Sequence, residues 1–387
     1  MNKYKVVTSM FIFIITSIMI KTLISNKGKF RDALVSDNLI KGVEDIYNKD
    51  LGFAGKFIHC WSITQWILGT ELLDDAESRY LIKDSTGNLY FPYFENNEGS
   101  VYDLAEKTIS YSNLVESRGS NFIYIQAPNK VIENYSSDTV FAFNDANKSA
   151  DKFLNYLEEK NVNTLDLRKK LPNSGLDLQD LFYKSDHHWK TKTAFWGFQE
   201  IFKYLKNNYN LDLNDLYISL DNYNTKLYEN CFLGSLGRRV YTPLSTIDDY
   251  LLIYPKFDTD YEVINGAQNT TIATGDFLNS IVINKILDNP DIKTNRYATY
   301  FEWDYGNLII KNNTCDNNIK ILMIKDSFAL PVAAYLSTCV KEIHMVDLRD
   351  NEAVNLTEYV QNYDFDIVMM LFNPETFNST MFNFEKK

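Results

Sequence analysis

The sequence predicts an α/β domain whose sheet is largely parallel. From about residue 100, short apolar segments of strand length alternate with amphipathic helical segments, an order typical of such domains. In these sheets, ligands bind where the carboxyl ends of the strands meet the helix starts. The expected strands are "NFIYIQ" (121–126), "VNTLDL" (162–167), "IKILMI" (319–324), "KEIHMV" (341–346) and "DIVMML" (366–371).

The helical segments are predicted by apolar residues at steps of three and four. In "TAFWGFQEIFKYLKNN" (193–208), Phe195, Phe198, Phe202 and Leu205 fall on one face, which should pack on a core. The segment 101–119 ends at a glycine, a common helix stop, and "ADKFLNYLEEKN" (150–161) is a third amphipathic segment. Further upstream, "YLIKDSTGNLYFPYF" (80–94) predicts two short strands around a turn.

The N-terminus carries an uncharged apolar run at 6–20, followed by Lys21. If Lys21 snorkels, the run extends to about 19 residues, close to the roughly 20 that a spanning helix needs. Because no A-x-A-like cleavage site follows, we expect a signal anchor over 1–25 rather than a cleaved signal peptide. The basic residues at 21–31 leave the positive-inside rule undecided. We expect a mixed segment at 26–99 and one domain at 100–387, located outside the cytoplasm.

The composition excludes several classes of protein. A hydrophobic content of 45% with 23% charged residues describes a folding chain, not a disordered one. A net charge of −12 argues against a general nucleic-acid binder, which needs a basic face. The cysteines Cys60, Cys231, Cys315 and Cys339 form no C-x-x-C pair, so neither a zinc site nor a disulfide scaffold is indicated.

Half of the four histidines lie side by side in "YKSDHHWKTKTAFWGF" (183–198). In an extended segment, Asp186 and His188 point the same way, so the carboxylate could orient the imidazole. The alternatives are a capping aspartate beside incidental histidines, and a metal site. The metal site is disfavoured because adjacent histidines face apart and only His59 and His344 remain as partners.

A serine occupies the turn after the expected strand at 319–324. Ser327 stands at the carboxyl end of that strand and at the start of a helix, whose free N–H groups suit a developing oxyanion. The alternative is that Asp326 or Ser327 merely caps the helix. With Asp186 and His188, Ser327 completes the side-chain types of a catalytic triad, although 139 residues separate His188 from Ser327 (327 − 188).

An ordered set of short motifs resembles the DHHW family of bacterial surface proteins. These are relatives of the alginate O-acetylation proteins AlgJ and AlgX, which carry a circularly permuted SGNH-hydrolase-like domain. The motifs are "PNK" (128–130), "DHHW" (186–189), "GSLGRR" (234–239), "KDSF" (325–328) and "DLR" (347–349). One departure is Lys325, which stands where the family usually has a glycine before Asp-Ser.

The resemblance implies a three-layer α/β/α domain and a division of roles. Ser327 would be the nucleophile, His188 the base and Asp186 its partner. Candidate residues for the oxyanion hole or for substrate binding are Asn129, Lys130, Gly234, Ser235 and Trp303. The alternative for the first four is that they are simple turn residues; Trp303, with Phe301 and Tyr305, is either a sugar-stacking platform or core packing.

The resulting prediction is an extracytoplasmic, membrane-anchored O-acetyltransferase or O-acetylesterase acting on a cell-surface polysaccharide. It needs no metal or cofactor, because the acyl group is carried by the serine. The resemblance implies an acetyl donor supplied through a membrane-bound O-acyltransferase. The alternative is a non-catalytic carbohydrate-binding or assembly subunit of an acetylation complex that retains the fold.

Overall fold

The computed structural model describes residues 3–35, 39–50, 54–74, 80–94, 98–133, 135–240 and 244–385. The chain forms two compact units, residues 1–80 with 239–241, and residues 81–238 with 242–387. The second unit, called the body below, therefore begins well before residue 100, the predicted boundary. The reason is visible at Leu89, whose N–H donates to the Lys184 carbonyl oxygen at 3.0 Å and whose own carbonyl accepts from Lys130.

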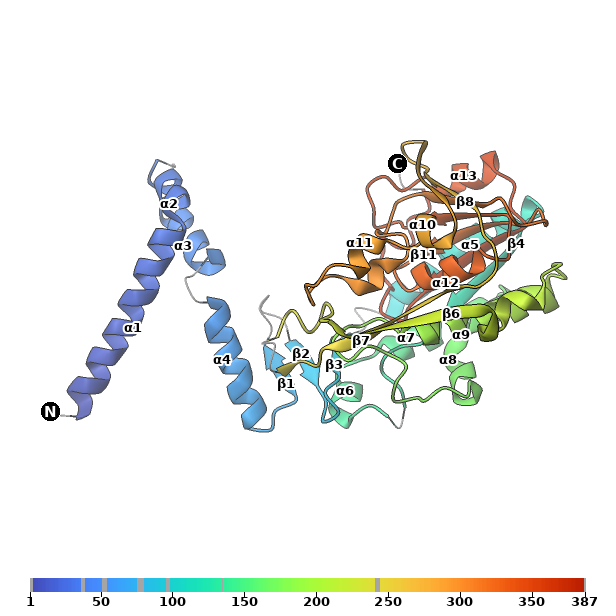
Figure 1. Ribbon diagram of the computed structural model, residues 1–387. Coiled ribbons are helices and arrows are strands. Elements are labelled where there is room, and N and C mark those ends of the chain that lie inside the picture. Colours follow the sequence, from blue (N-terminus) through green and yellow to red (C-terminus); the bar gives the residue numbers. More distant parts are fainter. Residues whose placement is uncertain are drawn as a thin grey trace. The chain divides into compact units, whose positions relative to one another are not determined.

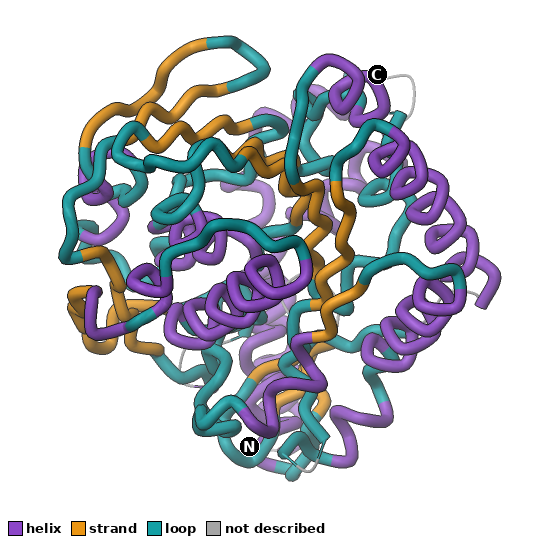
Figure 2. Tube along the Cα trace, turned by 90° about the vertical axis from the view of Figure 1, so that its right-hand side faces the viewer, coloured by secondary structure: helices purple, strands orange, loops and turns teal. Residues whose placement is uncertain are grey.

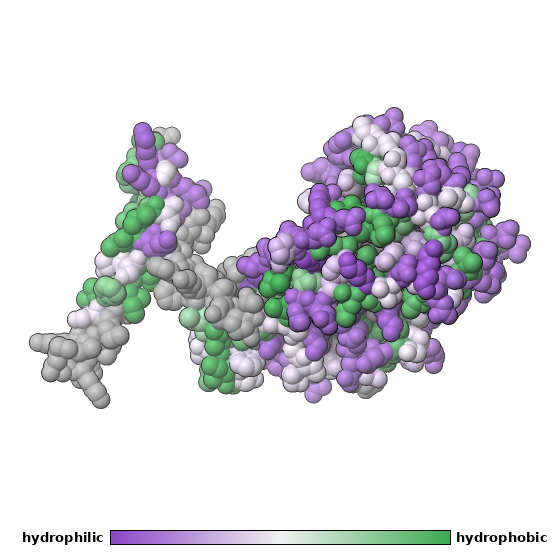
Figure 3. Space-filling model, in the orientation of Figure 1, coloured by the Kyte–Doolittle hydropathy of each residue, from purple (hydrophilic) through white to green (hydrophobic). Residues whose placement is uncertain are grey.

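The first unit is mostly helical (Figure 1). Its elements are α1 (Lys3–Ser25), α2 (Lys27–Leu34), α3 (Leu39–Asp50), α4 (Ala54–Ile67) and β1 (Leu72–Asp74). Helix α1 covers the predicted anchor and exposes apolar side chains such as those of Phe13 and Ile24. Figure 3 shows hydrophobic residues along this helix. Even so, among the described residues no helix is both long enough and apolar enough to cross a membrane. The transmembrane helix expected at 1–25 is therefore not found, and part of the segment expected at 26–99 lies outside the described residues.

The body contains the alternating elements that the sequence predicted. Its helices are α5 (Glu98–Ser117), α6 (Asp138–Ala142), α7 (Ala146–Glu159), α8 (Leu167–Lys170), α9 (Thr191–Asn208), α10 (Phe277–Ser280), α11 (Asn284–Leu287), α12 (Ala329–Leu336) and α13 (Leu356–Asn362). Its strands are β2 (Tyr80–Lys83), β3 (Leu89–Tyr90), β4 (Asn121–Gln126), β5 (Thr164–Asp166), β6 (Tyr223–Phe232), β7 (Asp248–Pro255), β8 (Tyr261–Asn265), β9 (Thr270–Gly275), β10 (Leu308–Asn312), β11 (Lys320–Lys325), β12 (Glu342–Val346) and β13 (Ile367–Phe372).

The central sheet is mixed, with strand order β5-β4-β13-β11-β12-β10-β8-β9. The five strands that the sequence predicted, β5, β4, β13, β11 and β12, pair in parallel. The other three are antiparallel additions at one edge, and the prediction of a parallel sheet missed them. From β11 the chain first adds β12 on one side and then β13 on the other. The carboxyl end of β11 is thus a topological switch point, where ligands bind in such sheets.

Helices cover both faces of the sheet, which gives three layers (Figure 2). The residues of β11 contact the two helical layers in turn, because successive side chains in a strand point to opposite faces of the sheet. Ile321 and Met323 pack in the core that contains α9 and α12, whereas Leu322 and Ile324 pack with α5, α7 and α13. Both faces are therefore mainly apolar, with an exception at the buried His344 of β12, whose ring bonds Tyr359 and Glu342.

Candidate active site

Three side chains form a chain of hydrogen bonds at the carboxyl end of β11. The Nε2 atom of His188 lies 2.7 Å from the Ser327 Oγ, and its Nδ1 lies 2.6 Å from Oδ1 of Asp186. All three residues are buried or nearly so, with 7%, 9% and 2% of their surfaces exposed for His188, Ser327 and Asp186. This is the arrangement in which an imidazole can take a proton from a serine hydroxyl while a carboxylate orients it.

The turn between β11 and α12 is held by Asp326, not by Ser327. Oδ1 of Asp326 accepts the backbone N–H of Phe328 at 2.9 Å, and its Oδ2 accepts bonds from Asn373 and Thr376. Burial raises the pKa of Asp326, while the hydrogen bonds from Asn373 and Thr376 oppose the rise. The capping alternative therefore applies to Asp326 and leaves the Ser327 hydroxyl to His188.

Asp186 is held at its place by the segment 234–237. Its Oδ2 accepts the backbone N–H of Ser235 at 2.6 Å, and a Cβ added to Gly234 would come within 2.6 Å of that same oxygen. Burial alone would raise the pKa of Asp186, but His188, His187 and these hydrogen bonds hold the pKa well below its usual range. Gly234 and Ser235 thus position the acid, and their backbone N–H groups are already occupied.

The imidazole of His188 is also fixed by aromatic neighbours. Its ring stacks on that of Tyr297, with centroids 3.7 Å apart and planes 11° apart. The fully buried Trp189 donates from Nε1 to the Tyr297 hydroxyl at 2.9 Å and to the Phe328 carbonyl at 3.1 Å. Trp189 therefore connects the histidine loop to the serine turn.

Lys130 lies under the same loop and was predicted as a substrate or oxyanion residue. Its Nζ donates instead to backbone carbonyl oxygens of Leu89, Tyr183, Lys184 and Asp186, at 2.7, 2.7, 3.1 and 2.8 Å. Only 8% of the residue is exposed. An ammonium so used cannot face a substrate, so Lys130 is a positioning residue for the loop that carries Asp186.

The expectation that the two adjacent histidines face apart is wrong: the rings of His187 and His188 lie side by side, with centroids 3.8 Å apart, and both residues line one cleft with Ser327. The Nδ1 of His187 lies 3.1 Å from the Ser235 hydroxyl, and burial beside His188 lowers the pKa of His187 to about 3. Asp186, His187 and His188 each offer a ligand atom within 4.8 Å of the others, so the set could hold a metal ion. A metal would have to displace the His188 bond to Asp186 or to Ser327, because both ring nitrogens are in use.

A cleft of about 680 Å³ opens over the triad. Ser327 and His188 line it together with Trp303, Arg349 and Asp347. Arg349 contacts Asp347 through two bonds, from Nε at 2.9 Å and from Nη2 at 2.6 Å. The nucleophilic oxygen is thus reachable from a groove large enough for a sugar-sized ligand.

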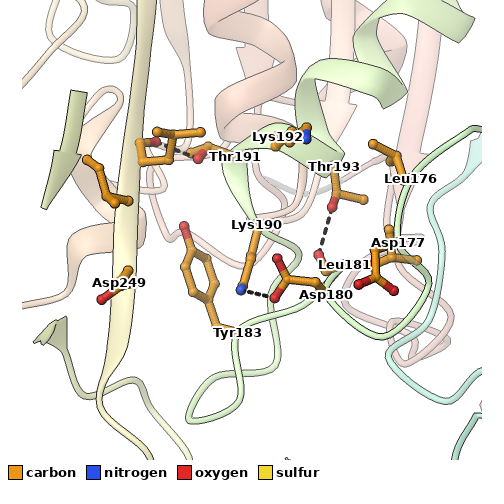
Figure 4. A pocket seen from close by; sticks show the side chains of 12 residues that line it. Leu176, Asp177, Asp180, Leu181, Tyr183, Lys190, Thr191, Lys192, Thr193 and Asp249 are labelled. Carbon is orange, nitrogen blue, oxygen red and sulfur yellow. Dashed lines mark hydrogen bonds and ion pairs between the residues drawn. The ribbon is translucent and has the colours of Figure 1, made fainter. Parts of the chain in front are cut away.

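Two smaller hollows of the body differ from this cleft, although one of them shares His187 with it. Asn129, whose Nδ2 has no hydrogen-bond partner in the part of the chain that the structure describes, lines a very small pocket with His187 and Phe328. A larger pocket of about 210 Å³ lies beside Tyr183 and the ion pair between Lys190 and Asp180 (Figure 4). Neither hollow is lined by Ser327, so the chemistry belongs to the large cleft.

The structure thus divides the residues singled out by the sequence. It brings together Asp186, His188 and Ser327, and it places Trp303 in the cleft. Lys130, Gly234 and Ser235 lie behind the histidine loop and support it. Asn129 instead lies in a small pocket beside His187 and Phe328, and its role in the site stays a prediction. Sequence reasoning missed Tyr297, because one tyrosine among 26 carries no local signal for stacking on a distant histidine.

The body has an SGNH-hydrolase-like α/β fold. Residues 102–216 match the family described as SGNH hydrolase-like domain, acetyltransferase AlgX, which confirms the predicted resemblance. Among solved structures, Bacillus cereus PatB1 is similar, with a TM-score of 0.64 and 20% identity over 79% of this chain and 99% of that one. A DHHW family protein from Eubacterium siraeum gives 0.58 and 16% identity over 80% and 97%. Among curated proteins, none is similar enough in sequence to count as a relative.

Proposed function

We propose that the chain is an O-acetyltransferase that modifies hydroxyl groups of a cell-surface polysaccharide through an acetyl group carried on Ser327. The observation that carries the proposal is the continuous hydrogen-bonded path from Asp186 through His188 to Ser327, at 2.6 and 2.7 Å. The path ends in an open cleft, so an ester can reach the serine. Chemistry of this class needs a nucleophile, a base and an orienting group, and no metal.

In the first half-reaction, Nε2 of His188 takes the proton of the Ser327 hydroxyl as Oγ attacks the acetyl carbonyl carbon of the donor. The tetrahedral intermediate then collapses. The bond to the donor oxygen breaks, and that oxygen leaves with the proton from His188. The product is acetyl-Ser327. The ionised Asp186 stabilises the imidazolium that forms between these steps.

In the second half-reaction, a sugar hydroxyl enters the cleft and gives its proton to His188. Its oxygen attacks the acetyl carbon, and the bond to Ser327 Oγ breaks with return of the proton to that oxygen. The products are an O-acetyl sugar and the free serine. If water replaces the sugar hydroxyl, the same steps give an acetylesterase, so exclusion of water decides between transfer and hydrolysis.

Two donors near Ser327 are available for the oxyanion. Within the described residues, the backbone N–H of Ser327 makes no hydrogen bond, and it lies at the start of α12, where the helix dipole favours negative charge. The Arg349 side chain also lines the cleft, and its Nη1 has no acceptor within the same residues. We assign both groups to the carbonyl oxygen of the acetyl group.

The similar proteins support the acetyl chemistry. The matched family is described as an acetyltransferase, and PatB1 has also been solved with a sulfonyl adduct. We further propose that the body lies outside the cytoplasm and receives acetyl groups through a membrane-bound O-acyltransferase. Surface protease treatment of intact cells tests the location, since an extracytoplasmic body should be cleaved and a cytoplasmic one protected.

A sulfonyl fluoride tests the nucleophile directly. Intact-mass measurement of the purified chain should show one covalent sulfonyl group, localised by peptide mapping to Ser327. The Ser327→Ala chain should remain unlabelled, and the buried Ser149→Ala chain, altered away from the cleft, should be labelled as the wild type is. Labelling that survives in Ser327→Ala would overturn the proposal and favour a carbohydrate-binding subunit.

A further inference from the structure

The side chain of Trp303 is exposed at the cleft, whereas the other tryptophans of the body are buried. It is 66% exposed, while Trp189 and Trp196 are 0% and 6% exposed. Trp303 lines the same cleft as Ser327 and His188. An indole face in water costs free energy unless a ligand covers it, and its flat apolar surface suits the C–H face of a pyranose ring.

The backbone before Trp303 is strained, and its surroundings hold the strain. Phe301 and Glu302 both have left-handed backbone angles, with φ of 67° and 66°, which are rare for residues other than glycine. Phe301 is buried, and its N–H donates to the Ile281 carbonyl oxygen at 3.0 Å. Glu302 donates likewise to Ala298 at 3.1 Å. Backbone strain that the surrounding contacts hold in place commonly marks a functional site. Here the strained residues directly precede the exposed Trp303.

The residue after Trp303 is tied to the catalytic strand. Asp304 pairs with Nζ of Lys325 and, at 3.2 Å, with Nη2 of Arg349. Lys325 is 1% exposed and also bonds Asp347 at 3.0 Å. Because Lys325 precedes Ser327 by two residues, this ion pair fixes the Trp303 segment relative to the nucleophile. The lysine that replaces the usual glycine thereby has a structural role.

The charges of the cleft limit what it can bind. Among the described residues, four carboxylates line it, those of Glu302, Asp304, Asp347 and Asp350, and one guanidinium, that of Arg349. The buried ammonium of Lys325 pairs with Asp304 and Asp347 and so neutralises one of the four negative charges. Lys285, which does not line the cleft, pairs with Glu302. Counted among the described residues, four carboxylates thus stand against three cations, those of Arg349, Lys325 and Lys285. An additional carboxylate from a ligand would be repelled in this partly desolvated groove.

We propose that Trp303 is the acceptor subsite of the cleft, and that it takes a neutral or amino-sugar ring in preference to a uronic acid. The inference rests on the proposed function, since the ring that stacks on Trp303 presents its hydroxyl to acetyl-Ser327. It adds the class of glycan, namely one without carboxylates on the sugar bound there.

Binding without an acetyl donor tests this inference separately from the acetyl chemistry. We would titrate the full chain by calorimetry with a chitin pentamer (neutral), a chitosan pentamer (cationic) and a galacturonate pentamer (anionic). The first two should bind at least ten times more tightly than the third. Trp303→Ala should weaken both at least tenfold, and Trp66→Ala, which removes a 50% exposed indole of the first unit, should leave them unchanged. Unchanged binding in Trp303→Ala, or no binding of either pentamer to the wild type, would overturn the inference.

The charge argument has its own variant. Glu302→Gln with Asp350→Asn removes two carboxylates from the cleft while leaving Trp303 and the Asp304 ion pairs in place. The ratio of galacturonate to chitin affinity should rise at least threefold. A wild-type chain that prefers galacturonate, or a ratio that the variant leaves unchanged, would refute the preference against uronic acids. Ser327→Ala should bind all three pentamers as the wild type does, so failure of acetyl transfer and failure of binding are told apart.

Discussion

The Nζ of Lys130 lies 2.8 Å from the carbonyl oxygen of Asp186, the residue that orients the catalytic imidazole. The same ammonium holds three further carbonyls, so one buried cation organises the loop that a triad needs. The acid is thus placed by its own backbone as well as by its side chain. Burial lowers the pKa of Lys130 to about 8, while nearby carboxylates, Asp248 foremost, oppose that change.

Lys130→Met should cost both stability and activity. Four carbonyl oxygens would lose a donor in a dry site, which we expect to lower the free energy of unfolding by about 3 kcal/mol. The turnover of a model acetyl ester should fall at least tenfold, because Asp186 would move with the loop. Urea unfolding and ester turnover measure the two effects. Lys148→Met is the control, since the Nζ of Lys148 forms an exposed ion pair with Asp145, and its loss should change stability by less than about 1 kcal/mol. If the two variants lost equal stability and equal turnover, the role of Lys130 in holding the loop of Asp186 would be contradicted.

Strong periodic signals made much of the fold predictable. The predicted strand 121–126 matches β4 residue for residue, and the predicted helical segment 193–208 ends where α9 ends and begins two residues later. These segments are buried on one or both faces, so their hydrophobic pattern records their environment. The antiparallel strands β8 and β9 escaped prediction because "YEVIN" and "TTIATG" are short, and β9 lies exposed at the edge.

The site was predictable only in part, for a related reason. The triad could be proposed because Asp186 and His188 are adjacent in sequence and Ser327 follows a strand. The supporting residues act through backbone atoms, which no side-chain pattern reports. Lys130 binds carbonyls, and Gly234 is required because its missing Cβ lets Asp186 approach. Such roles appear only when distant segments meet.

Ser327→Ala should separate catalysis from folding. The Ser327 hydroxyl bonds His188 and does not cap α12, so its loss should change the free energy of unfolding by less than about 1 kcal/mol. Ester turnover should fall by about a thousandfold or more. His188→Ala should lose a similar amount, and the double variant should be little worse than either, because triad members act as a unit. Additive losses in the double variant would argue that the two residues act independently.

Asp186→Asn should be milder than either of those changes. The amide keeps the shape of the carboxylate but cannot stabilise the imidazolium of His188, and it can favour the wrong tautomer. We expect turnover to fall less than in Ser327→Ala while sulfonyl labelling of Ser327 becomes slow but detectable. Labelling rate and ester turnover measure the effect. A variant with wild-type turnover would remove Asp186 from the mechanism.

Gly234→Ala tests the close approach behind the acid. The new Cβ would come within 2.6 Å of Asp186 Oδ2 and 2.7 Å of the Ser185 carbonyl oxygen, so the loop must shift. We expect unfolding to become easier by about 2 kcal/mol and ester turnover to fall at least tenfold. Gly28→Ala is the matched control, because a Cβ there meets nothing within 4 Å and lies in α2, where alanine is favoured. A stable, fully active Gly234→Ala chain would show that the contact is not required.

Glu375 should make stability depend on pH in a direction opposite to that of Asp186. Burial raises the pKa of Glu375 to about 6, although a 3.2 Å bond from Asn144 and the nearby Lys130 both oppose the rise. Its folded pKa lies above the unfolded value of 4.5, so the folded state binds more protons between these values, and stability falls as pH rises from about 4.5 through 6. The loss should approach about 1 kcal/mol, because Glu375 is half-buried and water screens part of the effect that burial has on its pKa.

Glu375→Gln should remove this dependence while retaining an acceptor for Asn144. Relative to the wild type, the variant should gain about 1 kcal/mol of stability between pH 4 and pH 7 and gain no more above pH 7. The depressed pKa of Asp186 gives both chains the same loss of stability in acid, so it cancels in the difference. Urea unfolding at a series of pH values measures that difference, with the exposed Glu133→Gln as a control for removing one carboxylate. A difference that stays constant, or that shrinks as pH rises, would show that burial does not raise the pKa of Glu375.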